Sequence, residues 1–214
     1  MVVGNDYDES LLAYDARPGV HVYAKDADGR LHLTRNDYAP SLMRSVVRHS
    51  ALGRYLVFNL DAVETAKQVA ARWGLSSTAQ AAEPQFAGNT AAEASPERVR
   101  DSQGAVLAFF DDLAKTVPLP PDRIAFVMDG ARYQSDVAFV ERSYFGIMRN
   151  YFMREAAARG YEVIDMQREF LARSRDRQSH FEYPTDGHWN PIGHEVVAQA
   201  LGASRLYGKI FAPK

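Results

Sequence analysis

The sequence predicts an α/β fold that is built on a parallel sheet. Two short segments, Ile124–Met128 and Tyr161–Met166, have the length and composition of strands, and the first is typical of a strand buried on both faces. Segments with helical periodicity precede, separate and follow them. The resulting order of helix, strand, helix, strand and helix predicts neighbouring parallel strands that are joined by a crossover helix.

The N-terminal part predicts a strand end and then a hairpin. Val2–Val3 is a two-residue apolar stub, and Gly4–Asp6 has the composition of a turn. Gly19–Thr34 predicts a β-hairpin insertion, because apolar and polar residues alternate on both sides of the turn Asp26–Gly29. Gly29 suits a turn position with positive φ.

The next part predicts a helical region and a loop. Apolar residues recur at spacings near three and four over Pro40–Trp73, with Gly74 as the expected end of the helical pattern. Leu75–Ala94 is rich in Ala, Ser, Thr, Gln and Gly, which favours a flexible loop. We expect residues 1–214 to belong to a single domain.

Local signals mark the helices that alternate with the strands. Ser95 and Pro96 are suited to the N-cap and first position of a helix that ends before Pro118. A second helix is expected over Ser135–Arg159, with Gly160 at its C-terminal end.

The last helix has equally clear signals. Asn190 and Pro191 predict its N-cap and first position, and Gly202 follows its last periodic residue. The loop that precedes it is expected at the carboxyl edge of the sheet, where open α/β sheets bind their ligands. The expected buried stripe consists of Ile192, Val196, Val197, Ala200 and Leu201.

Composition excludes several classes of protein. The 214 residues carry a formal net charge of -2 and a pI of about 6.3, so no basic surface field is expected to attract nucleic acid. No apolar run is long enough to cross a bilayer. The absence of cysteine excludes disulfides, thiolate metal sites and a cysteine nucleophile. The bacterial cytoplasm and periplasm both stay open, since any signal peptide would lie upstream of Met1, and the oligomeric state stays open too.

Asp186 and His188 are the strongest candidate pair for chemistry. An imidazole takes a proton from a hydroxyl and returns it to a leaving group, and a carboxylate on its other nitrogen fixes the tautomer. Two residues of separation in a turn allow the two side chains to meet. The alternative for an isolated Asp-x-His is a capping aspartate beside a surface histidine.

The stretch from Asp186 to His194, which reads Asp-Gly-His-Trp-Asn-Pro-Ile-Gly-His, resembles the last conserved block of the SGNH (GDSL-type) hydrolases. It is closest to the Asp-x-His-x-Asn branch, which includes bacterial polysaccharide O-acetyltransferase-like and acetylesterase-like proteins, whereas many other members have Asp-x-x-His. The resemblance implies a flavodoxin-like three-layer α/β/α sandwich, with His188 as general base and Asp186 as its orienting partner.

A second block supports the resemblance. Gly4-Asn5-Asp6 after Val2–Val3 is similar to the block that supplies an asparagine to the oxyanion hole, although it is one residue shorter. The resemblance therefore implies that Asn5 donates to the oxyanion, a type of interaction worth roughly 3–4 kcal/mol of barrier. No cofactor and no metal are expected.

The nucleophile block of this family, Gly-Asp-Ser, is missing from the chain. The most similar stretch is Asp101–Ser102, where we expect an exposed helical serine. Ser135 is expected to cap a helix. We therefore expect an N-terminally incomplete domain that lacks its first strands, and an inactive fragment. The intact protein would be an esterase or O-acyltransferase for small acyl esters, with carbohydrate O-acetyl groups as one candidate.

Three further residues are candidates for substrate binding, each with a simpler alternative. Trp189 either stacks on a sugar ring or packs in the core, and Arg132 either contacts substrate or is a solvated loop arginine. His180 either lines a substrate entrance or lies on a loop surface. Two other functions stay open: a non-catalytic SGNH-like module that binds carbohydrate or protein, and, with less support, a metal-dependent hydrolase that uses His188 with His194.

Overall fold

The structure is a computed structural model that describes residues 6–37, 49–51, 55, 95–174, 180–183 and 186–211, with only the backbone of Asp186. The chain divides into two compact units. The first comprises Met1–Arg17, His21–Arg35 and Pro84–Lys214, and the second Pro18–Val20 and Asn36–Glu83. All elements below belong to the first unit. The predicted strand stub, the helical region after Pro40 and the flexible loop fall outside the described residues, apart from a few positions between 49 and 55.

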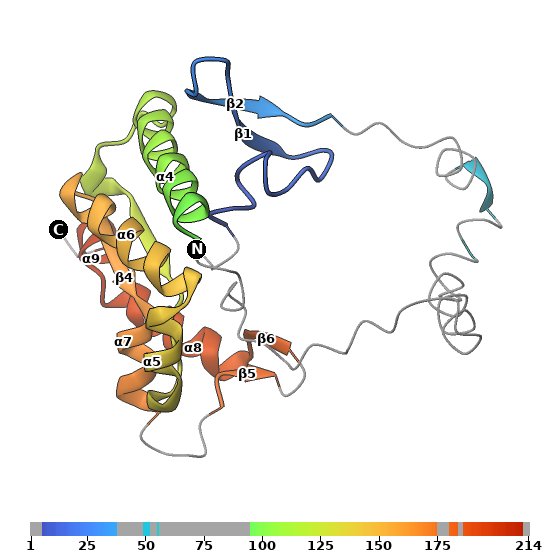
Figure 1. Cartoon of the computed structure of the whole chain (residues 1–214). Coiled ribbons are helices and arrows are strands. Elements are labelled where there is room, and N and C mark those ends of the chain that lie inside the picture. The colour runs from blue at the N-terminus through green and yellow to red at the C-terminus, as the bar shows by residue number, and fades with distance from the viewer. Residues whose placement is uncertain are drawn as a thin grey trace, which may run out of the picture. The chain divides into compact units, whose positions relative to one another are not determined.

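The first unit is mixed α/β (Figure 1). Among the described residues its strands form three two-stranded sheets: antiparallel β1–β2, parallel β3–β4 and antiparallel β5–β6. The bounds are β1 His21–Lys25, β2 Leu31–Arg35, α4 Pro96–Thr116, a 3-10 turn Pro121–Arg123, β3 Ala125–Met128, α5 Gln134–Arg142, α6 Tyr144–Ala158, β4 Glu162–Asp165, α7 Met166–Arg173, β5 Glu182–Tyr183, β6 Asp186–Trp189, α8 Pro191–Gly202 and α9 Arg205–Phe211.

The predicted hairpin is present as β1 and β2. His21 pairs with Arg35 and Lys25 with Leu31, and Gly29 in the turn has φ of 78°. The hairpin packs on α4 through the buried ring of Tyr23, whose hydroxyl donates to Asp112 at 3.2 Å. These contacts attach the hairpin to the helix that precedes β3.

The parallel pair β3–β4 confirms the central prediction of the sequence. Phe126 pairs with Val163 and Val127 with Ile164. Phe126 and Val163 contact an apolar cluster that contains side chains of α4 and α6, whereas Val127 contacts a second cluster with side chains of α7 and α8. Both faces of β3 are therefore covered, as expected, although Ala125–Val127 are only partly buried.

The first cluster is dominated by aromatic rings. Phe110 lies 4.9 Å from Phe152 and 5.7 Å from Phe126 between ring centroids, and its ring stacks on Tyr161 at 5.5 Å. Offset and edge-to-face pairs of this kind add about 0.5–1.5 kcal/mol each beyond the area they bury. They hold α4 and α6 against the same face of the pair β3–β4.

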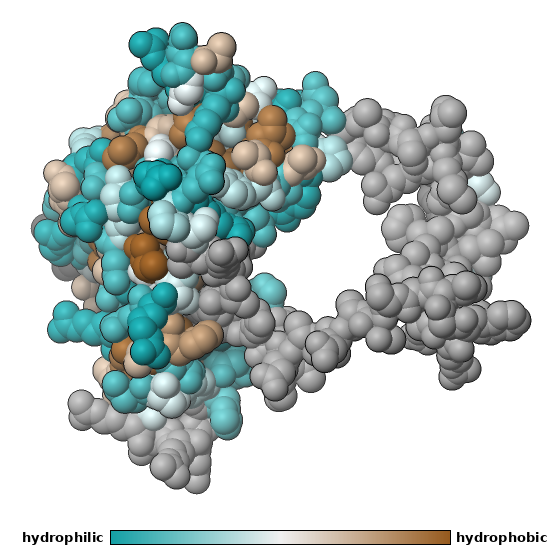
Figure 2. All heavy atoms as spheres, viewed as in Figure 1, coloured by the Kyte–Doolittle hydropathy of each residue, from teal (hydrophilic) through white to brown (hydrophobic). Residues whose placement is uncertain are grey.

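The visible surface of the first unit is largely hydrophilic, with separate apolar patches (Figure 2). Two residues of the predicted stripe of α8, Ile192 and Leu201, contribute to the exposed apolar surface, with 48% and 39% of their area accessible. Val196, Val197 and Ala200 are buried as predicted. The helix therefore presents a narrower stripe to the core than the sequence suggested. Among the described helices, none is long and apolar enough to span a membrane.

The helix predicted over Ser135–Arg159 is two helices, α5 and α6. Ser143 separates them and caps α6, with its hydroxyl oxygen accepting the N–H of Gly146 at 3.2 Å. Gly146 lies so close to the end of α5 that an added Cβ would be 2.1 Å from the carbonyl oxygen of Val140. The apolar periodicity continues across this junction, which is why the sequence suggested one helix.

We expect Gly146→Ala to destabilise the protein by about 1–3 kcal/mol, as overpacked substitutions commonly do, because the backbone of α5 must move. Gly208→Ala in α9 is the matched control, since its added Cβ would meet nothing within 4 Å. The control is expected to gain up to about 1 kcal/mol from helix propensity. Urea denaturation measures both changes. Equal stability of the two variants would show that α5 and α6 do not meet as described.

Candidate functional site

A buried ion pair lies directly after β3, at the carboxyl end of the parallel strands. Asp129 and Arg132 each have 2% of their side-chain area exposed, and Nη2 of Arg132 lies 3.3 Å from Oδ2 of Asp129. Arg132 also donates to Glu182 of β5 at 3.2 Å. One guanidinium therefore joins the end of β3 to β5.

Asp129 also holds the strand that carries the candidate base. Its Oδ1 accepts the indole N–H of Trp189 at 3.2 Å and the backbone N–H of Gly130 at 2.9 Å. Burial raises the pKa of Asp129, while the charge of Arg132 and the hydrogen bonds from Gly130 and Trp189 lower it. These donors replace the water that the carboxylate loses on folding.

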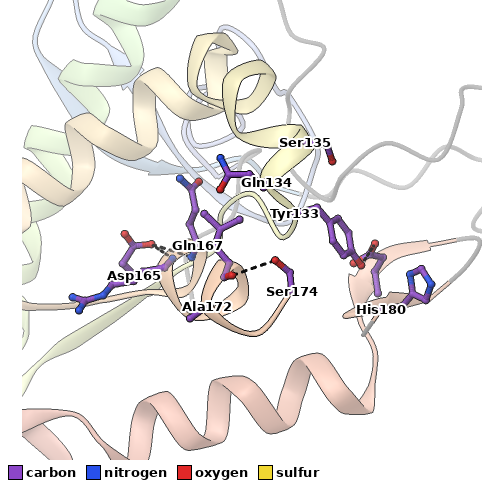
Figure 3. A pocket seen from close by; sticks show the side chains of 11 residues that line it. Tyr133, Gln134, Ser135, Asp165, Gln167, Ala172, Ser174 and His180 are labelled. Carbon is purple, nitrogen blue, oxygen red and sulfur yellow. Dashed lines mark hydrogen bonds between the residues drawn. The ribbon is translucent and has the colours of Figure 1, made fainter. Parts of the chain in front are cut away.

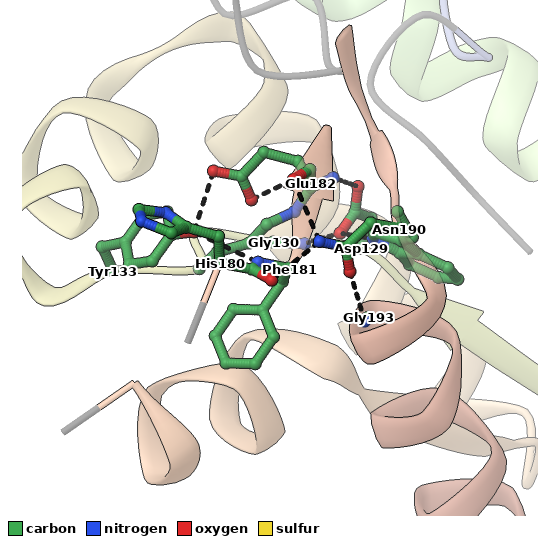
Figure 4. A network of polar contacts seen from close by, with 10 residues as sticks. Asp129, Gly130, Tyr133, His180, Phe181, Glu182, Asn190 and Gly193 are labelled. Atoms are coloured by element: carbon green, nitrogen blue, oxygen red, sulfur yellow. Dashed lines mark hydrogen bonds and ion pairs between the residues drawn. The ribbon is translucent and has the colours of Figure 1, made fainter. Parts of the chain in front are cut away.

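The side chain of Asn190 connects residues 180–182 to the start of α8 (Figure 4). Its Oδ1 caps α8 by accepting the N–H of Gly193 at 2.9 Å, and its Nδ2 donates to the carbonyls of His180 at 2.8 Å and Glu182 at 3.1 Å. Its own N–H donates to the carbonyl of Phe181 at 2.9 Å. The predicted N-cap is thus confirmed, and the same side chain also fixes β5 against the start of α8.

Gly193 is required for this arrangement. A Cβ at this position would lie 2.4 Å from the carbonyl oxygen of Phe181 and 3.0 Å from the Cβ of Trp189. Only glycine lets the first turn of α8 approach this closely. The approach keeps the backbone of Phe181 and the end of β6 in place.

His188 lies on β6, one residue before Trp189. Successive residues of a strand point to opposite faces, so the buried ring of Trp189 directs the imidazole of His188 outward. The side chain of His188 is exposed, in agreement with this alternation. The sequence placed His188 in a loop. It is instead in a short strand, because Glu182 pairs with Trp189 and Tyr183 with Asp186.

Two of the predicted catalytic side chains lie outside the described residues. Asn5 is one, and the side chain of Asp186 is the other, although its backbone belongs to β6. The contact between Asp186 and His188 therefore stays a prediction, as does the oxyanion role of Asn5. In the described part of the chain, no group of three or more acidic or histidine side chains is placed to hold a metal ion.

The three candidate substrate residues lie in different surroundings. Trp189 is 8% exposed and its ring meets Phe170 edge-on at 5.9 Å. It therefore packs in the core, which was the alternative to stacking on a sugar ring. Arg132 is buried in the ion pair, so it is not a solvated loop arginine. His180 is exposed and lines a groove beside α5 and α7, with its ring 6.4 Å from that of Tyr133.

The serines considered in the sequence are not placed as nucleophiles. Ser102 is fully buried, contrary to the expectation of an exposed helical serine, and its hydroxyl shares a 2.5 Å hydrogen bond with Tyr144. Ser135 is the second residue of α5 rather than its cap, and its hydroxyl donates to Asp136 at 2.9 Å.

Asp129 is the residue whose role in the site the sequence did not reveal. The available signal was an acid directly after a buried strand, at the edge where α/β sheets gather functional groups. Comparison with family models, with curated proteins and with solved structures found no match to this chain. The assignment of a function therefore depends on the residues themselves.

We expect Arg132→Met to destabilise the protein by about 3–5 kcal/mol, because it leaves the buried carboxylate of Asp129 without its charged partner. Arg154→Met is the control, since Arg154 is 65% exposed and should change stability by less than about 0.5 kcal/mol. The double variant Asp129→Asn, Arg132→Met should recover part of the loss. Urea denaturation gives all three values, and a strictly additive double variant would contradict the coupling of the pair.

Proposed function

We propose that this chain is part of an SGNH-type serine esterase or O-acyltransferase with the three-layer α/β/α fold of that superfamily. His188 is the general base, Asp186 its orienting partner and Asn5 the side-chain donor to the oxyanion. The substrate class is a small acyl ester, and a carbohydrate O-acetyl group is the candidate favoured by the resemblance.

One observation carries the proposal. The exposed imidazole of His188 sits on a strand whose opposite side is fixed to the carboxyl end of β3 through Trp189 and Asp129. A general base must be accessible to substrate and held in a defined orientation.

The proposed chemistry follows from these positions. His188 takes the proton of a serine hydroxyl as the oxygen attacks the ester carbonyl, and later returns it to the leaving alcohol. The amide of Asn5 donates to the oxygen that becomes negative, and the carboxylate of Asp186 stabilises the imidazolium. Transfer of the acyl group to water gives an esterase, and transfer to a second alcohol gives a transferase.

The nucleophilic serine is proposed to come from sequence outside this chain. Ser102, Ser135 and Ser143 all have their hydroxyls engaged with other groups, and Ser174 donates to the carbonyl of Leu171. None of these four described serines is therefore proposed as the nucleophile, and the chain is proposed to supply the base and one oxyanion donor of the site.

The test compares the 214-residue chain with the product of the longest open reading frame that contains it. We expect the longer product to hydrolyse p-nitrophenyl acetate and the shorter one to be inactive. His188→Ala in the longer product should lower kcat by about 10⁴-fold or more, and Asp186→Asn by a similar factor, as in other serine triads. His194→Ala, in α8, is the matched control and should retain activity.

Three results would contradict the proposal or part of it. A longer product whose activity survives His188→Ala would remove His188 from the reaction. An active 214-residue chain that loses activity in His188→Ala would place the nucleophile within these residues. An inactive longer product, folded by circular dichroism, would favour the non-catalytic binding module.

A further inference from the structure

An open groove of about 1250 Å³ lies between the start of α5 and α7 (Figure 3). Gln134 and Ser135 of α5 border one side, and Ala172 and Ser174, at the end of α7, border another. Asp165, the last residue of β4, also lines it, so the groove opens at the carboxyl ends of the parallel strands. A sizeable hollow at this edge is the usual place for a ligand in α/β proteins.

Each of the two carboxylates of the groove wall contacts a guanidinium. Asp165 forms an ion pair with Arg149, and Glu182 forms one with the buried guanidinium of Arg132. Asp165 also accepts the N–H of Gln167 at 2.9 Å as the cap of α7. Both carboxylates therefore already have a charged donor beside them, and Arg132 shares its single charge between Glu182 and Asp129.

The groups left to meet a ligand are donors. Arg168 is exposed, and no ion-pair partner for it lies in the described part of the chain. His180 faces the groove from the opposite wall, with an exposed side chain. Tyr133 occupies the N-cap position of α5 without accepting a capping hydrogen bond, so the N–H groups of Gln134 and Ser135 have no side-chain cap.

The wall also has an apolar part. Leu171, Ala172 and the ring of Tyr133 line it, and Phe181 stacks on the far side of that ring at 6.1 Å. Burial and the neighbouring Glu182 raise the pKa of Tyr133 to about 12, so its hydroxyl stays protonated and bonded to Glu182 at 2.8 Å. The ring is thus held in one orientation, which suits contact with a flat apolar group.

We infer that this groove binds an organic anion, namely a carboxylate, phosphate or sulfate attached to an apolar or ring-shaped body. The anionic group lies within reach of Arg168, and the body lies against Tyr133 and Ala172. The inference does not depend on a catalytic role for His188, because it concerns binding to a different set of side chains. Glu182 connects the two places, as it lines the groove and pairs with Trp189 across β5–β6.

The experiment is an NMR titration of the 214-residue chain with benzoate, and with benzamide as its uncharged counterpart. We expect saturable shifts of backbone signals around Tyr133, Arg168 and Ala172 with benzoate, and at least about tenfold weaker binding of benzamide, since hydrogen bonds to charged groups are worth about 1.5–3 kcal/mol. Arg168→Gln should weaken benzoate to the same extent. Arg154→Gln, an exposed arginine on α6, is the matched control and should leave the affinity unchanged.

A second variant tests the position of the apolar body. Ala172 is exposed, so Ala172→Trp should fold normally while its ring fills the groove and abolishes the benzoate shifts. Equal affinities for benzoate and benzamide would overturn the anionic part of the inference. Shifts that persist in Ala172→Trp, an equal loss in Arg154→Gln, or the absence of any saturable shift would each overturn the site itself.

Discussion

The carboxylate of Asp129 is buried beside the guanidinium of Arg132, and the rest of the site is attached to this pair. Asp129 ends the strand β3 on one side and holds the indole of Trp189 on the other. Arg132 carries the connection on to Glu182 in β5, 50 residues away along the chain. Removing Arg132 leaves the buried carboxylate of Asp129 without a charged partner in a medium of low dielectric constant, where water cannot replace it. The pair therefore fixes where β5 and β6 lie relative to the parallel strands.

Three consecutive residues of the chain, 188–190, have different roles in the attachment of β6. Because side chains alternate along a strand, one residue can anchor it while the next faces solvent. Trp189 supplies the anchor with a buried ring and a bonded N–H, and His188 supplies the exposed group. Asn190 follows the strand and caps α8. Trp189 therefore anchors β6, His188 faces solvent, and Asn190 ends the strand. A side chain displayed in this way needs little further ordering to make a contact, since the backbone beneath it is already ordered.

Helix caps and the parallel pairing of β3 with β4 could be predicted from the sequence, whereas side-chain contacts between distant segments could not. Ser95 and Asn190 cap their helices as expected, because an N-cap is decided within three residues. The break at Ser143 was not predicted, since it depends on how closely Gly146 approaches the backbone of α5. Arg132 was expected on a loop surface for the same reason: its partner Glu182 lies in a segment that no sequence pattern brings to it.

The same distinction explains what the sequence could say about the groove and about His188. The pattern around His188 identifies a residue type at a helix start, and local rules place it near the carboxyl edge of the sheet. The groove instead arises where α5, α7 and β5 meet, and its charge depends on which carboxylates are already paired. Asp165 and Glu182 contribute carboxylates to the wall, and in the folded chain Arg149 and Arg132 lie against them. The basic groups of the wall that remain exposed to a ligand are the side chains of Arg168 and His180. They are the reason for inferring an anionic ligand, although the chain as a whole carries a net negative charge.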